Sequence, residues 1–171
     1  NRQLTQVTKQ LASSVRRAKG VDVTELKGAA DQAVATVKET LGGIDALIAA
    51  GDLEAAMESL EGLQEQMEEA RQKTQIIDSV ANVSKVVRDM QRQIKAFNRD
   101  IKKLERKKTD VTVLKAALAE FKSKIEELSA AAKGGTDPED LFGLMEEMFE
   151  LKEALQDQLD ELRGVEKEIL P

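Results

Sequence analysis

Apolar residues recur at steps of three and four from Asp52 to Lys108, which is the pattern of one apolar stripe along an α-helix. This stretch has no proline, and its only glycine is Gly62. We therefore expect a helix over about residues 53–107, on the order of 80 Å long at about 1.5 Å per residue. Weaker helix formers between Gln72 and Ser84 leave a break open as the alternative. The stripe consists of Leu53, Met57, Leu60, Leu63, Met67, Ala70, Ile77, Val80, Val83, Val87, Met90, Ile94, Phe97, Ile101 and Leu104.

Four further helices follow from the same periodicity and from their end signals. Gly20 and Gly51 stand where a helix C-terminus needs a left-handed residue. Asp22 and Asp52 are of the type that caps a helix N-terminus, and Pro138 suits the first turn of the last helix. We expect five helices, at about residues 2–19, 23–50, 53–107, 111–133 and 138–168.

The second half of the chain repeats the first. The turn Asp22-Val23-Thr24 returns 88 residues later as Asp110-Val111-Thr112, and the apolar residues of the following helices pair at the same offset. In the first helix of each half the offset is 90, as between Val7 and Phe97. Repetition at a fixed period indicates a duplicated supersecondary unit. Leu26 and Leu114, and likewise Leu53 and Leu141, should then lie in equivalent surroundings.

This duplication predicts an all-α fold of two tandem antiparallel three-helix bundles. The first unit covers residues 1–76 and the second covers residues 77–171, with the helix 53–107 bridging both. A core of Leu, Ile, Val, Ala and Met, with only 2% aromatic residues, suits helix-on-helix packing.

Charge follows the same division. The helix over 2–19 has five bases and no acid, whereas residues 52–70 contain seven acids and no base. Residues 83–108 contain ten bases against three acids, and residues 135–171 contain twelve acids against three bases. We expect the basic first helix and the acidic third helix of each unit to be neighbours whose flanking charges pair.

The residue types present predict no catalytic, cofactor-binding or metal-binding residues. The chain has no Cys, so it has no cysteine nucleophile or thiolate ligand, and no His, the commonest general base and metal ligand of proteins. The carboxylate clusters Glu65-Glu68-Glu69 and Glu146-Glu147-Glu150 fall mostly on polar helix faces. No apolar run approaches the roughly 20 residues needed to cross a bilayer. The chain opens at Asn1 in mid-pattern and stops at Pro171, so we expect a segment of a larger protein. The absence of a signal peptide then says nothing about the parent protein.

Two resemblances support a non-enzymatic role. The motif GVDVTEL over 20–26, an Ala-rich helix, and AGDLEAA over 50–56 resemble helical segments of uncharacterised bacterial and archaeal envelope-associated proteins. The likeness covers about residues 15–70. Three-helix units joined by a continuous helix also resemble a pair of spectrin repeats, although the tryptophan typical of those repeats is absent. Neither resemblance brings catalytic residues, and both imply a spacer or interaction module, the first at a cell surface or envelope.

The candidate partner-binding residues are Phe142 and Phe149. They are seven residues apart beside the Leu141–Met145–Met148 stripe, and they align with Glu54 and Glu61 in the first unit. If exposed, they would form an apolar patch suited to a partner helix. The four methionines Met57, Met67, Met145 and Met148 fall on the core stripes, where ordinary packing is the favoured interpretation.

Ten bases between Lys85 and Lys108 raise the alternative of a nucleic-acid or anionic-lipid surface. The net charge of −6 and the absence of interleaved aromatic residues favour a solvated face paired with the acidic third helix. We therefore expect a structural spacer or scaffold segment of a larger protein, with no small-molecule substrate. A protein-binding module using Phe142 and Phe149 is the alternative, and self-association through the apolar stripes stays open.

Overall fold

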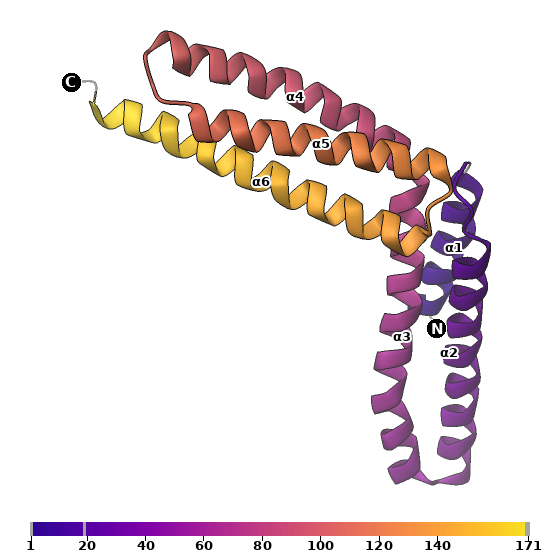
Figure 1. Cartoon of the computed structure of the whole chain (residues 1–171). Coiled ribbons are helices and arrows are strands. Elements are labelled where there is room, and N and C mark those ends of the chain that lie inside the picture. Colours follow the sequence, from indigo (N-terminus) through magenta and orange to yellow (C-terminus); the bar gives the residue numbers. More distant parts are fainter. Residues whose placement is uncertain (1, 19, 170–171) are drawn as a thin grey trace. The chain divides into compact units, whose positions relative to one another are not determined.

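The chain is all-α (Figure 1). The computed structural model describes residues 2–18 and 20–169, with side chains to residue 164, and over these residues it contains six α-helices and no β-strand. The helices are α1 (Arg2–Arg17), α2 (Thr24–Ala50), α3 (Leu53–Ala81), α4 (Val83–Arg106), α5 (Thr112–Gly134) and α6 (Pro138–Ile169).

The helix expected over 53–107 is two helices, because α3 ends at Ala81 and α4 begins at Val83. At Asn82 the backbone N–H donates to the Ser79 carbonyl at 3.0 Å, and the side-chain amide donates to the Asp78 carbonyl at 2.8 Å. A short polar side chain that bonds to a nearby carbonyl competes with the helical ladder. The prediction of five helices is therefore corrected to six, and the break falls within the segment where the sequence left one open.

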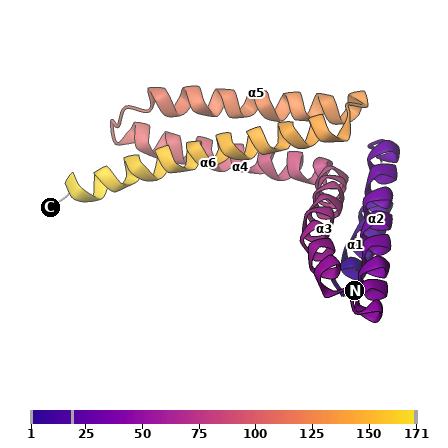
Figure 2. The same cartoon turned by 90° about the horizontal axis from the view of Figure 1, so that it is seen from below.

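Two compact units divide the chain, Asn1–Asn82 and Val83–Pro171. In the first unit α3 packs against α2 and α1, and α1 also contacts α2. In the second unit α5 packs against both α4 and α6, as the views in Figure 1 and Figure 2 both show. The boundary lies six residues beyond the expected one at residue 76.

The core of the first unit contains Val7 from α1, Ala33 from α2 and Ala70 from α3, with Val34 and Met67 packed against it. Alanine at two of these three positions lets the helices approach closely. Fully buried Val37 and Ile77 extend this core. A hydrogen bond of 2.8 Å from the Thr40 hydroxyl to the Gln66 side-chain oxygen joins α2 to α3.

Larger side chains fill the core of the second unit. Phe97 of α4 meets Phe121 of α5 edge to face, with ring centroids 6.1 Å apart and an interplanar angle of 85°. This is a favoured geometry for two aromatic rings. Leu114, Leu128 and Leu155 are also nearly or fully buried.

The duplicated turn has the same geometry in both units. The Asp22 carboxylate accepts from the Thr24 backbone N–H at 3.0 Å, and the Asp110 carboxylate accepts from that of Thr112 at 2.9 Å. The valine after each aspartate has nearly the same backbone angles, φ −112° and −117° with ψ 17° in both. Each aspartate thus forms a local turn one residue before the helix N-cap, where the sequence suggested Asp22 as the cap itself.

The duplication holds at one end of the units and fails at the other. Leu26 and Leu114 are both buried, as predicted. Leu53 is 63% exposed whereas Leu141 is fully buried, and Met57 is 68% exposed whereas Met145 is 4% exposed. The predicted equivalence of Leu53 and Leu141 is therefore wrong, and so is the assignment of Met57 to the core. The lengths of the first helices give the physical reason, because α1 has 16 residues and α4 has 24.

The α2–α3 turn depends on a left-handed glycine. Gly51 has φ 80°, its N–H donates to the Ile48 carbonyl at 3.1 Å, and the Asp52 N–H donates to the Leu47 carbonyl at 3.0 Å. Asp52 also caps α3 as predicted, because its carboxylate accepts from the Ala55 N–H at 3.2 Å.

We expect Gly51→Ala to lower the free energy of unfolding by about 1 kcal/mol, since a Cβ disfavours positive φ. Gly62→Ala, inside α3, is the matched control and should raise it by about 0.5–1 kcal/mol. A Cβ would meet no atom within 4 Å at either position, so backbone conformation alone separates the two. Urea unfolding measures both variants, and a change of the same sign in both would contradict this explanation.

Candidate binding surface

The two candidate phenylalanines lie on α6, two helical turns apart. Phe149 is 40% exposed and Phe142 is half-buried. Residues seven apart on a helix share one face and are about 10 Å apart along the axis. Leu141, Met145 and Met148 are buried, as the sequence predicted for the stripe beside them. The exposed apolar surface is thus centred on Phe149 and reaches only part of Phe142.

Acidic side chains surround Phe149 on its own helix. Glu146 and Glu153 stand three and four residues away, the positions that adjoin Phe149 on a helix surface, and both are exposed. Lys152 is the one base among these neighbours and is half-buried. A ligand of this surface would need an apolar group flanked by positive charge.

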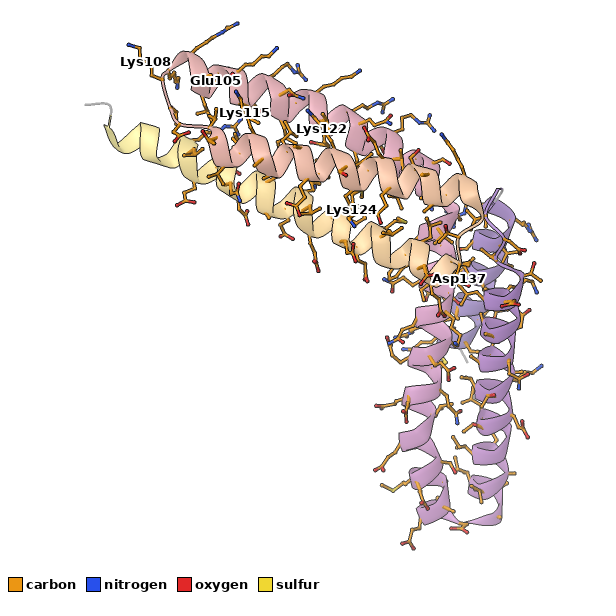
Figure 3. All side chains as sticks on the ribbon, in the orientation of Figure 1. Glu105, Lys108, Lys115, Lys122, Lys124 and Asp137 are labelled. Atoms are coloured by element: carbon orange, nitrogen blue, oxygen red, sulfur yellow. The ribbon has the colours of Figure 1, made fainter. Side chains whose placement is uncertain are left out.

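Lys124 of α5 connects to α6 near this surface (Figure 3). Its ammonium group lies 2.8 Å from carboxylate oxygens of both Glu127 and Glu147. Hydrogen bonds to Glu127 and then to Glu147 raise the pKa of Lys124 well above its ordinary value. Lys124 therefore stays charged and holds α5 to α6, a structural role that leaves it no access to proton-transfer chemistry near neutral pH.

A surface hollow of about 280 Å³ lies in the second unit, between the start of α5 and the later turns of α6. The buried side-chain oxygen of Gln158 has no hydrogen-bond partner, and the exposed Val113 forms part of the rim. The volume falls just below the roughly 300–1,000 Å³ typical of small-molecule sites. This hollow was not predicted from the sequence. The signal that could have indicated it is Val113, an apolar residue off the core stripe. Its lining residues are Asp110, Val113, Leu114, Gln158, Glu161 and Leu162.

The basic residues of α4 and the turn after it are all exposed. Nitrogen-tipped side chains project from the side of α4 that faces away from α5, as far as Lys108 (Figure 3). Seven of the bases recur at steps of three and four, opposite the buried stripe, which is the arrangement of a solvated helix face. These seven are Lys85, Arg88, Arg92, Lys95, Arg99, Lys102 and Arg106.

The predicted pairing of a basic first helix with an acidic third helix is seen in the first unit. There, Arg17 of α1 bonds to Asp78 of α3 at 2.5 Å. In the second unit Asp100 of α4 pairs with Arg163 of α6 at 2.8 Å, so in this bond the acid is on the basic helix. Charge content therefore indicated which helices are neighbours, but it gave the wrong polarity for this bond.

The Asp100 carboxylate also accepts from Lys103 at 3.1 Å. Partial burial pushes the pKa of Asp100 upward, but the hydrogen bond from Lys103 and the charge of Arg163 outweigh burial and hold this pKa below its ordinary value. A carboxyl whose pKa is lower in the folded than in the unfolded state stabilises the fold above its unfolded pKa, about 3.9. That stabilisation disappears as pH falls through the folded-state pKa.

We therefore expect Asp100→Asn to lower the free energy of unfolding by about 0.5–1 kcal/mol at pH 7, a modest effect because Arg163 is partly solvated. The deficit should shrink as the pH falls below about 3.9 and vanish once the pH is below the folded-state pKa of Asp100, because the wild-type carboxyl is then protonated. Urea unfolding across this pH range measures it. Asp89→Asn, which removes only the exposed bond within α4 to Arg92, should cost about 0.3 kcal/mol and is the matched control. A deficit that does not decrease as the pH falls from 7 would contradict the ionic explanation.

A polar cluster joins α1 to α3 in the first unit. The buried Ser14 hydroxyl donates to Asp78 at 2.6 Å, and the Arg17 guanidinium bonds to the same oxygen. Burial of Ser14 behind these partners gives the cluster a structural role, because its hydroxyl is inaccessible to a substrate. The 64-residue separation between Ser14 and Asp78 leaves no local signal of their bond in the sequence.

Metal-binding and membrane-spanning features are absent from the part of the chain that the structure describes. Among the described side chains, those of residues 2–18 and 20–164, no three acidic groups lie closely enough to hold a metal ion. In the same residues, no helix combines the length and apolar character needed to cross a membrane.

Comparison with protein families, with curated proteins and with solved structures finds no significant match to this chain.

Proposed function

We propose that this chain is a non-enzymatic structural spacer within a larger protein, built as two tandem antiparallel three-helix bundles of a spectrin-like plan. The observation that carries the proposal is the pair of compact units with the same turn chemistry, at Asp22–Thr24 and at Asp110–Thr112. A duplicated unit whose side chains serve mainly its own core adds length to a polypeptide. The resemblance of residues 15–70 to envelope-associated proteins supports a location at a cell surface or envelope.

The chemistry of the side chains supports a role without catalysis. The chain has neither His nor Cys. Its buried Ser14 is bonded to Asp78, and its perturbed Lys124 is held by two carboxylates. Ser14 thus bonds α1 to α3, and Lys124 bonds α5 to α6.

A spacer has to carry tension while its own units stay folded, and this requirement can be measured. The absence of native cysteine lets two introduced cysteines, Gln3→Cys in α1 and Glu161→Cys in α6, carry the handles for stretching a single molecule. Unfolding under force should occur in two cooperative steps, one for each compact unit. Phe149→Ala, at an exposed position, is the control and should leave both steps unchanged. Gradual lengthening without such steps would contradict the spacer proposal.

The second candidate is a protein-binding module that uses Phe142 and Phe149, and the exposure of Phe149 favours it. An exposed aromatic side chain contributes binding free energy when a partner desolvates it. Pull-down with wild type, Phe149→Ser and Val113→Ser tests this candidate, since Val113 is a second exposed apolar residue of the same unit. A partner lost with Phe149→Ser and kept with Val113→Ser would support binding. A partner kept by both variants would exclude Phe149 as its site.

A further inference from the structure

Four of the six large apolar side chains that are exposed in the described part of the chain gather at the α2–α3 turn. Leu53, Met57 and Leu60 stand at steps of four and three, so they share one face of α3. Ile48 lies on the last turn of α2, beside the same turn. Contiguous exposed apolar residues on a helix face usually mark a surface that another element covers.

This face is exposed because α1 does not extend beside it (Figure 1). The Ser14–Asp78 bond sets the register of two parallel helices, in which each α1 residue is level with the α3 residue numbered 64 higher. Arg2 is therefore level with residue 66. In agreement, Gln3 lines a surface hollow together with Leu63 and Met67. Leu53 lies about 20 Å beyond this level at about 1.5 Å per residue.

The second unit has helix at the corresponding place. The Asp100–Arg163 bond sets an offset of 63 between α4 and α6, so Val83 is level with residue 146. Val83, Val87 and Met90, on the first turns of α4, are buried, and Met145 and Met148 of α6 are buried as well. Because α1 and α4 align at an offset of 90, these turns of α4 have no counterpart in α1.

The charge around the exposed face identifies the kind of helix that would complement it. Residues 39–70 contain nine acids and no base. The acids closest to the exposed stripe are themselves exposed, namely Glu54, Glu58 and Glu61. Packing this face against the same face of a second copy would bring like charges together, at a cost that opposes association. A basic amphipathic helix, like α4, matches both the apolar stripe and the acids.

We propose that the face formed by Ile48, Leu53, Met57 and Leu60 is the seat of a basic amphipathic α-helix, which would lie in line with α1 as the first turns of α4 lie in the second unit. Such a helix would place its apolar residues on Met57 and Leu60 and its bases beside the flanking glutamates. Such a helix would complete the first unit at the end of α3 that α1 does not reach. This inference is independent of the spacer proposal, since it concerns how one unit is covered.

A graft of the second unit's own sequence tests the seat. Gln91 aligns with Asn1 at the offset of 90, so residues 83–90 are placed directly before Asn1 in the full chain. In this register the copy of Val83 is level with Met57. We expect hydrogen exchange of the amides in residues 57–64 to slow by about tenfold or more, because local opening must now break an added helix contact.

Two controls keep the outcome decisive. An extension in which the copies of Val83, Val87 and Met90 are glutamine should leave exchange in residues 57–64 unchanged. Met57→Gln should accelerate exchange in the grafted chain and have little effect in the parent chain, where Met57 is solvated. Equal protection by the apolar and the glutamine extensions would overturn the proposal. Sedimentation equilibrium of the parent chain is the second measurement: a monomer supports it, whereas a dimer that Leu53→Glu dissociates would assign the face to a second copy and overturn it.

Discussion

Replacing Phe121 with alanine is expected to lower the free energy of unfolding of the second unit by about 3–5 kcal/mol. Phe121 is fully buried, and its ring meets that of Phe97 edge to face at 6.1 Å. The substitution removes the transfer free energy of the ring, leaves a cavity, and breaks an aromatic contact that contributes about 0.5–1.5 kcal/mol beyond burial. Small domains have a total stability of about 5–15 kcal/mol, so much of the second unit's stability would be lost.

Urea unfolding monitored by hydrogen exchange of α5 measures this effect within its own unit. Phe149→Ala is the matched control on the same chain, and its exposed ring predicts a change within about 0.5 kcal/mol. Comparable losses in the two variants would mean that Phe121 does not form the core described for this unit.

Ile77→Ala is expected to destabilise the first unit by about 2–5 kcal/mol. Ile77 is fully buried in α3, one turn after the buried Thr74, whose hydroxyl donates to the Ala70 carbonyl at 2.8 Å. Ile48→Ala, at an exposed position of α2, should change stability by less than about 0.5 kcal/mol and is the matched control.

Ile77→Ala also tests the division of the chain. Hydrogen exchange should accelerate in α2 and α3 and remain unchanged in α5, because the core of each compact unit is its own. Equal acceleration in both units would show that they unfold as one body and would contradict a division at Asn82.

The helices and their turns could be predicted from the sequence because their determinants are local. Gly51 needs a left-handed conformation, Asp52 caps the next helix, and Pro138 begins α6. The repeated turn at Asp22 and Asp110 was likewise predicted to recur, and its hydrogen bonds agree within 0.1 Å. Such signals depend on a few neighbouring residues, so they can be recognised in the sequence before the packing of the helices is known.

What could not be predicted depends on contacts between distant helices. The stripe Leu53–Met57–Leu60 has a core pattern, but a stripe is buried only where a neighbouring helix extends beside it, and α1 stops short. The polarity of the Asp100–Arg163 pair depends on the rotation of two helices, which charge content does not specify. The break at Asn82 depends on a local competition between side-chain and backbone hydrogen bonds, and the residue types alone do not show which of them forms.

The candidate binding surface could be predicted only in part from the sequence, for a similar reason. Phe142 and Phe149 occupy the same face by spacing, but the sequence does not reveal that one is half-buried and the other exposed. The spacer and binding proposals therefore differ in the role of Phe149, which contacts a partner only in the binding proposal. If Phe149 contacts a partner, the spacer also displays a binding site on its second unit.

Hydrogen exchange of the unmodified chain tests most directly the claim that one three-helix plan occurs twice, covered fully in the second unit and incompletely in the first. The account predicts similar protection for α2 around Val37 and for α5 around Ile125, both buried. It also predicts exchange about tenfold or more faster in residues 53–60 than in residues 141–148. Equal protection of these last two segments, or unequal protection around Val37 and Ile125, would contradict it.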